Sequence, residues 1–214
     1  MIDLHTHTFF SDGALVPAEH LRRFEVMEYT AVAITDHADS SNLDFIVPRI
    51  VQAALDLNPH SNTRLIPGIE LTHVPPELMK QLTDKARKLG ARIVVAHGET
   101  PVEPVIPGTN RAAIEAGVDI LAHPGFITEE EAALAAEKGI FLELSGRKGH
   151  SLTNGYVAKV ALKTGVGLVV NADAHEPGDF MTAERAEKVA LGAGLSMDHY
   201  LKIRNGMADL VSRI

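Results

Sequence analysis

Short apolar runs rich in β-branched residues alternate with longer segments of helical pattern, and this alternation constrains the fold more than any other feature of the chain. Repeated strand–helix units predict a parallel sheet covered by helices. We therefore predict an α/β fold in which seven parallel strands close, or nearly close, into a TIM-like β/α barrel, as a single domain over residues 1–214. The predicted strands are Ile2–His7, Ala31–Asp36, Arg64–Glu70, Arg92–His97, Asp119–His123, Ile140–Ser145 and Gly167–Asp173.

Capping signals mark the helices between these strands. Thr128 and Glu131 have the spacing of a capping box, and Pro75 with Pro76 suits the first turn of a helix. Glycines are expected where helices stop, at Gly90, Gly139 and Gly192. Further helices are predicted at residues 17–29, 42–57 and 154–163, and two more follow the last strand at 182–191 and 196–205.

Most of the predicted strands end in a residue that can bind a metal ion. From His7 to His123 these residues recur every 26 to 33 positions, which is about the length of one βα unit. Because the carboxyl ends of all strands in a barrel lie at one mouth, we expect these side chains to converge there. The predicted metal ligands are His5, His7, Asp12, His37, Glu70, His97, His123, Asp173 and His175.

The local spacing of these residues is consistent with shared cations. Residues two apart on a strand point to the same face, so His5 can bind together with His7, and Asp173 with His175. A lone catalytic zinc uses about three protein ligands, so nine ligands predict two to three divalent ions, with Glu70 free to bridge two of them. Zinc, manganese and iron(II) all accept mixed imidazole and carboxylate sites, and the sequence does not select among them.

Composition narrows the chemistry further. The chain has no cysteine, so any metal must be bound by nitrogen and oxygen. A net charge of -8 argues against broad binding to nucleic acid or to an anionic membrane, but it permits a small phosphorylated substrate. The start of the chain has no targeting pattern, and no apolar run approaches the roughly 20 residues that span a bilayer. These features predict a soluble, cytoplasmic protein; the oligomeric state is not indicated.

Each candidate also has a structural explanation when taken alone. Asp12 before Gly13 is typical of a turn, a single histidine at a strand end is often packed or capping, and Glu70 could simply precede a helix. The structural explanations would require nine independent coincidences at one mouth of the barrel. We therefore prefer the hypothesis that these residues form a metal site. Outside it, His20, His60 and His199 are predicted to be solvated, and His73 either supports the site or lies on the surface. Asp3 and Asp36 are predicted to face away from it, where they orient a histidine or accept bonds from backbone donors.

The sixth predicted strand ends without a ligand and opens into a glycine-rich loop. Arg147, Lys148 and His150 on this loop would suit a phosphate monoester, and Arg111 is a weaker candidate of the same kind. A solvated surface loop is the alternative, since exposed Arg and Lys are common on turns.

As an ordered set, these residues resemble the PHP domain, the polymerase and histidinol phosphatase superfamily. The matching motifs are Asp3-Leu4-His5-Thr6-His7 with Ser11-Asp12-Gly13, Ile34-Thr35-Asp36-His37, Gly68-Ile69-Glu70, Val95-Ala96-His97, Leu121-Ala122-His123-Pro124 and Asn171-Ala172-Asp173-Ala174-His175. The resemblance implies a distorted seven-stranded barrel and three metal ions. It implies that one ion takes His5, His7, Glu70 and Asp173, that a second shares Glu70 and adds His97 and His123, and that a third takes Asp12, His37 and His175.

The resulting hypothesis is a metal-dependent phosphoesterase that hydrolyses a small phosphate monoester with a hydroxide activated on the metal cluster. Histidinol phosphate is the first substrate to consider, by analogy with the family alone. The alternatives are a phosphodiesterase or exonuclease, an amidohydrolase, and a regulatory module that binds metal without turnover. Amidohydrolases usually place a lysine or its equivalent where this chain has His97, and they lack a bridging glutamate at the third strand.

Overall fold

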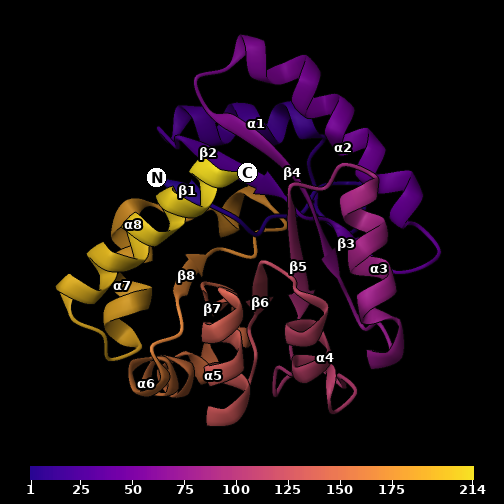
Figure 1. Cartoon of the computed structure of the whole chain (residues 1–214). Coiled ribbons are helices and arrows are strands. Elements are labelled where there is room, and N and C mark those ends of the chain that lie inside the picture. Colours follow the sequence, from indigo (N-terminus) through magenta and orange to yellow (C-terminus); the bar gives the residue numbers. More distant parts are fainter.

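The computed structural model describes residues 1–214, and its parallel strands curve into a nearly closed barrel with the helices outside (Figure 1). The predicted α/β barrel is therefore confirmed. The strands are β1 (Ile2–Asp3), β2 (Ala31–Ile34), β3 (His37–Ala38), β4 (Arg64–Leu71), β5 (Ile93–His97), β6 (Ile120–Ala122), β7 (Phe141–Ser145) and β8 (Leu168–Asn171). They are ordered β1-β2-β4-β5-β6-β7-β8, and β3 also pairs with β4.

The second barrel position is a single strand with an interruption. Both β2 and β3 pair with β4 in one register, since Ala31 lies opposite Arg64 and His37 lies opposite Glu70. The carboxylate of Asp36, in the gap between them, accepts bonds from the backbone N–H and hydroxyl groups of Thr8 and Ser11. Asp36 thus satisfies backbone donors, one of the two roles expected for it, and the barrel has the seven strand positions predicted.

The first strand is shorter than predicted, because only Ile2 and Asp3 pair with β2. Beyond them the barrel closes through side chains. The Asp3 carboxylate accepts the Ala172 N–H at 3.0 Å, and the side-chain carbonyl of Asn171 accepts the Leu4 N–H at 2.9 Å. One parallel bridge, between Thr6 and Ala174, completes the contact between the first and last strands. The seam between β1 and β8 is therefore the distorted part of the barrel.

Eight helices surround the sheet, and none of them is long and apolar enough to cross a membrane. Helices α7 and α8 follow β8, and α8 packs on both β8 and β1, so it covers the seam (Figure 1). The helices are α1 (Pro17–Val26), α2 (Leu43–Leu57), α3 (Pro76–Lys88), α4 (Thr109–Ala116), α5 (Glu129–Lys138), α6 (Asn154–Thr164), α7 (Ala183–Gly192) and α8 (Met197–Arg213).

Three helix ends differ from the prediction, and the first is α1, which ends at Val26 instead of residue 29. Helix α8 continues to Arg213 instead of stopping near residue 205, because its buried face, with Ile203 and Met207, keeps packing on the barrel. Gly192 lies inside α7, and the left-handed residue after that helix is Gly194, with φ +88°. The predicted capping box of Thr128 and Glu131 at the start of α5 is confirmed.

The prediction that His20 is solvated is wrong. His20 is buried on α1, and its Nε2 lies 2.8 Å from the Thr6 hydroxyl. Its ring packs against Phe24, one turn further along the helix, and against Phe180. The apolar face of α1 that packs on the barrel includes position 20, and a hydrogen bond makes burial of an imidazole there tolerable. His60 is exposed and His199 caps the start of α8, as surface positions should.

Candidate metal centre

All nine predicted ligands gather at the mouth where the parallel strands end. A polar cavity of about 150 Å³ opens there, and no hydrophobic residue lines it. His5, His7 and Glu70 are fully buried, and each lies within 4 Å of a lining residue: His5 and His7 of Asp173, and Glu70 of His37. The cavity is lined by Asp12, His37, Thr72, His97, Glu103, His123, Arg147, His150, Asp173 and His175.

The innermost group joins the first, third and last strand ends. His5 Nε2 lies 3.4 Å from Glu70 Oε1 and 3.8 Å from Asp173 Oδ1. His7 Nε2 lies 3.2 Å from Asp173 Oδ1 and 3.9 Å from Glu70 Oε2. Asp173 has a left-handed backbone with φ +53°, which is unfavourable for a non-glycine residue and is found where a site requires it.

A second group lies nearer the surface. Asp12 Oδ1 is 3.5 Å from His37 Nε2 and 3.2 Å from His175 Nε2. His175 Nδ1 lies 3.0 Å from the backbone oxygen of Asp173, a contact that leaves Nε2 free to bind a cation. His7 belongs to the same cluster, because one of its ring nitrogens lies within 4.8 Å of ligand atoms of Asp12, His37 and His175.

The third group is built on the fourth and fifth barrel positions. His123 Nε2 lies 3.6 Å from Glu70 Oε1, and the His97 and His123 rings meet edge to face at 4.4 Å. His123 also has a positive φ, +30°, at the end of β6. Glu70 therefore stands between the first and third groups, and its other oxygen lies 2.5 Å from His37 Nδ1 in the second.

Several buried polar atoms in the centre have no hydrogen-bond partner. They are His5 Nε2, both ring nitrogens of His7, Glu70 Oε1 and His123 Nδ1. An unpaired buried polar atom is costly, on the order of 1–3 kcal/mol each, and the Nε2 atoms of His5 and His7 lie within 4 Å of carboxylate oxygens. Divalent cations between these nitrogens and oxygens would satisfy them. The donor set, all nitrogen and oxygen, thus fits the metal ions that the sequence predicts.

The electrostatics of the centre agree with this fit. Burial raises the pKa of Asp173 to about 7 and, with neighbouring imidazoles, lowers the pKa of His7 and His123 well below the usual histidine range. Neutral imidazole is the form that binds metal. Although burial opposes it, the carboxylates of Glu143 and Glu70 raise the pKa of His5. Positive charge is therefore favoured at His5, beside Glu143 and Glu70, whereas His7 and His123 are neutral imidazoles.

Glu143 on β7 is a site residue that the sequence did not indicate. It is completely buried, and its Oε2 accepts a bond from His5 Nδ1 at 2.7 Å and from the Asn171 side-chain amide at 3.0 Å. A carboxylate that holds the far nitrogen of a histidine fixes the ring and directs its other nitrogen to the metal. The available signal was a carboxylate in the middle of the apolar run Phe141–Ser145.

The four predicted substrate-binding residues are divided by the structure. Arg147 lines the cavity, with NH1 2.8 Å from His175 Nδ1, and His150 is buried beside it. Lys148 is exposed and does not line the cavity. Arg111 lies on α4 and is held at the surface by ion pairs with Glu115 and Glu130, so the structure does not bring it to the centre.

The loop between β5 and α4 adds Glu103, which the sequence analysis missed. Its carboxylate lies 3.1 Å from both His97 Nε2 and His73 Nε2. His73 is half exposed and contacts the centre through Glu103. The bond to His97, together with the other histidines, lowers the pKa of Glu103 to about 2, so it is a carboxylate at neutral pH. A proline-rich loop directly after a ligand-bearing strand was the signal that could have pointed to it.

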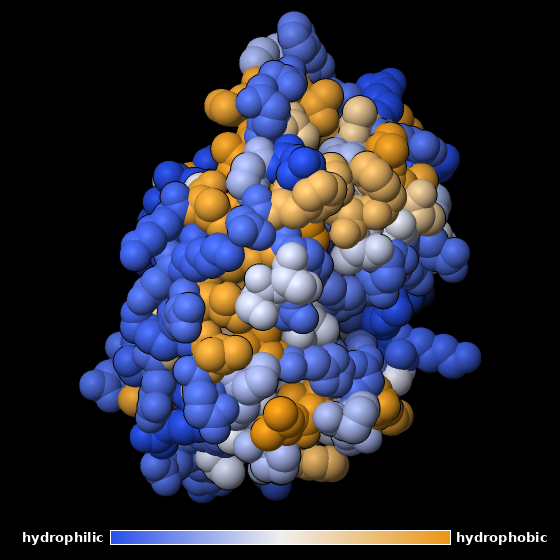
Figure 2. All heavy atoms as spheres, turned by 90° about the vertical axis from the view of Figure 1, so that its right-hand side faces the viewer, coloured by the Kyte–Doolittle hydropathy of each residue, from blue (hydrophilic) through white to orange (hydrophobic).

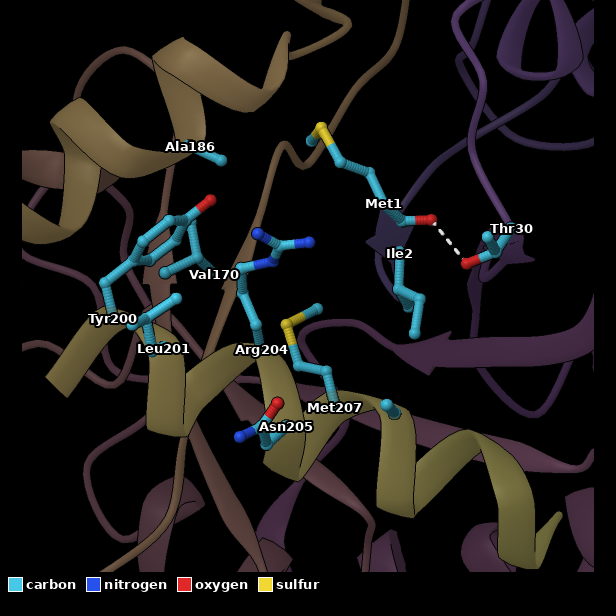
Figure 3. Close-up of a pocket in the computed structure, with 11 residues that line it drawn as sticks. Met1, Ile2, Thr30, Val170, Ala186, Tyr200, Leu201, Arg204, Asn205 and Met207 are labelled. Carbon is cyan, nitrogen blue, oxygen red and sulfur yellow. Dashed lines mark hydrogen bonds between the residues drawn. The ribbon is translucent and has the colours of Figure 1, made fainter. Parts of the chain in front are cut away.

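A larger cavity of about 360 Å³ lies elsewhere, beside the first residues of the chain and α8 (Figure 3). Most of its walls are apolar, from residues such as Ile2, Val170 and Met207, with Arg204 and Tyr200 among them. It contains none of the predicted site residues. The chemistry of the lining, and not cavity size, therefore locates the candidate site.

A nearly closed parallel barrel with clustered histidines and carboxylates at its carboxyl mouth defines the class: a metal-dependent hydrolase fold with a centre suited to several ions. The family model for the PHP domain matches residues 3–152, and the chain belongs to that family. The resemblance inferred from the motifs is confirmed.

Individual proteins are similar to this chain over a longer stretch than the family model. The uncharacterized protein MJ1295 of Methanocaldococcus jannaschii is 50% identical over 196 residues, which are 91% of this chain and 90% of that protein. The DNA polymerase/3'-5' exonuclease PolX of Bacillus subtilis is 27% identical over 81% of this chain, which spans 34% of that protein. A solved structure of a candidate histidinol phosphatase from Listeria monocytogenes has a TM-score of 0.58 at 12% identity, over 86% of this chain and 98% of that one. At this identity the likeness shows the fold alone.

Proposed function

We propose that this protein is a metal-dependent phosphoesterase that hydrolyses a small phosphate monoester. The observation that carries the proposal is the convergence of nine nitrogen and oxygen ligands into three groups around Glu70, with a guanidinium at the edge. His5, His7, Glu70 and Asp173 would hold one ion, and the other two groups would hold the rest. Such ions lower the pKa of bound water and offset negative charge on phosphoryl oxygens.

The residues of the chain prepare this chemistry. Glu143 fixes the ring of His5, and Thr72 lies 2.7 Å from His37 Nδ1, so two ligands are oriented by neighbours. The Arg147 guanidinium stands at the rim, where its planar fork can bind phosphate oxygens in pairs. A polar cavity of about 150 Å³ accepts a phosphoryl group, while the rest of a substrate must lie outside it.

A phosphodiesterase or exonuclease activity is the second candidate. The similarity to PolX, whose name includes a 3'-5' exonuclease, supports it. The net charge of -8 favours a small substrate over a long nucleic acid, which requires many Lys and Arg contacts to phosphates. We therefore place the monoester first, with histidinol phosphate as the first compound to test.

A substrate panel tests the proposal. The full chain, loaded separately with zinc, manganese and iron(II), is assayed on histidinol phosphate, other phosphomonoesters, phosphodiesters, single-stranded DNA and lactones. We expect kcat/KM for the best monoester to exceed that for any diester by about tenfold or more, and a chelator to abolish turnover. A preference for diesters or DNA would move the assignment to the second candidate. Turnover of lactones would indicate an amidohydrolase, and no turnover on any compound would favour a regulatory module.

A further inference from the structure

Two side chains of the cavity are not explained by the nine-ligand set. His150 and Glu103 come from different loops, yet both point at the position between His97 and His123. The family resemblance gives that position only Glu70, His97 and His123, one ligand fewer than the position formed by His5, His7, Glu70 and Asp173.

His150 has the geometry of a metal ligand. It is buried at the start of a short 3-10 helix (His150–Thr153), and its ring stacks on His123 at 4.1 Å. Its Nδ1 lies 2.8 Å from the Thr100 hydroxyl, a contact that leaves Nε2 directed into the centre, 3.9 Å from Asp173 Oδ2. One ring nitrogen of each of His97, His123 and His150 lies within 4.8 Å of the others. Small side-chain movements would bring all three onto one ion at the usual distance of about 2.1 Å.

Glu103 lies between the same imidazoles. Its Oε2 is 3.1 Å from His97 Nε2 and its Oε1 is 3.4 Å from His150 Nε2. A carboxylate that reaches two ring nitrogens on the side where they would face a cation is itself placed to bind that cation.

The loop that carries Glu103 is anchored to the site. Glu99, in the same loop, accepts the backbone N–H groups of Gly108 and Asn110 through one carboxylate oxygen. Thr100 fixes His150 from this loop as well. Hydrogen bonds therefore hold both ends of the loop segment that carries Glu103.

We infer that Glu103 and His150 are additional ligands of the cation position formed by His97 and His123, so that the loop between β5 and α4 contributes directly to metal binding. This inference rests on the proposed metal-dependent function. It reassigns His150 from substrate contact to metal ligand, and it predicts that one of the bound ions depends on this loop while the others do not.

The test measures metal binding without substrate. Apo protein and the variants Glu103→Gln and His150→Gln are titrated with zinc by calorimetry, and metal per chain is counted after dialysis. Each variant should weaken one metal equivalent by about tenfold or more, with the remaining equivalents unchanged. Cobalt(II)-loaded protein should show a changed visible absorption, because the spectrum depends on the ligands. His60→Gln, at an exposed histidine away from the centre, is the matched control.

The outcomes separate the two proposals. Wild-type protein that binds no metal would remove the proposed function and this inference together. Wild-type protein that binds metal, with variants that keep every equivalent and an unchanged cobalt spectrum, would overturn the inference alone. If His150 contacted only the phosphate of the substrate, His150→Gln would raise KM and leave metal affinity unchanged. That result would also contradict the inference. Circular dichroism of the variants shows whether they fold.

Discussion

Replacing Glu143 with glutamine should weaken cation binding at His5 without unfolding the barrel. In the native chain His5 Nδ1 lies 2.7 Å from a charged oxygen of Glu143. Glutamine has nearly the volume of glutamate, and its side-chain oxygen can still accept this hydrogen bond. What the substitution removes is the charge. A hydrogen bond with a charged partner contributes about 1.5–3 kcal/mol, against about 1 kcal/mol for a neutral one. The variant should therefore lose about 0.5–2 kcal/mol of metal binding, or about 2–30-fold in the dissociation constant.

The assay is a competition titration of apo protein with a chromophoric chelator, with circular dichroism to verify folding. Glu137→Gln, on the exposed side of α5, is the matched control and should leave metal affinity unchanged. Because Glu143 touches His5 and not the substrate cavity, turnover at saturating metal should fall less than metal affinity. A dissociation constant within about twofold of wild type, in a folded variant, would refute the argument that Glu143 orients His5.

Three further predictions address stability and the site. Burial lowers the pKa of His20 to about 3, whereas an unfolded histidine titrates near 6.5, so this group's stabilising effect is complete above pH 6.5 and is lost as the pH falls toward 3. The part of this loss that comes from His20 is on the order of 2 kcal/mol at pH 5 relative to pH 7. Urea titrations should therefore show a larger loss of stability in wild type than in His20→Gln, in which the other buried histidines still titrate. Asp173→Asn should lower turnover by about a hundredfold or more in steady-state assays and remove a metal equivalent; retained turnover would exclude Asp173 from the centre. Arg147→Ala should raise KM for the best monoester by about tenfold, whereas Arg111→Ala should leave it unchanged, and equal effects would contradict the placement of Arg147 at the rim.

The apolar patch on the outer face illustrates how surface and site differ. Figure 2 shows hydrophobic residues gathered in the upper part of the face that it presents, among hydrophilic ones. Exposed aromatic residues of the molecule include Phe9 and Phe45, and Arg49 lies over the Phe45 ring. The metal centre is the reverse, because its cavity has no hydrophobic lining. The outer patch and the metal centre therefore differ in the polarity of their residues.

The strand ends were predictable because the barrel imposes a regular repeat on the sequence. His37, Glu70, His97 and His123 recur with that repeat, so the parallel topology alone brings them to one mouth. The first strand was less predictable. The Leu4 N–H donates to the Asn171 side chain and the His5 N–H to the Asp3 carboxylate instead of to a neighbouring strand, and such pairing leaves no periodic signal.

The residues that support the centre lie outside this repeat. Glu143 reaches His5 across 138 positions, and the direction of its side chain follows from the closure of the barrel. Glu103 and His150 depend on the paths of two loops, which Glu99 and Thr100 fix through hydrogen bonds. Loop paths are set by tertiary contacts and have no periodic pattern, so the sequence could name candidates but not place them.

By itself, the sequence determined the parallel barrel, its family and the set of nitrogen and oxygen ligands, because strand periodicity and residue chemistry are local properties. Only the tertiary structure decided that His20 is buried in the packing between α1 and the barrel. It also decided which basic side chains lie at the mouth of the barrel, as Arg147 does and Arg111 does not. Those outcomes depend on distances between segments remote in the chain, and such distances exist only once the barrel has closed.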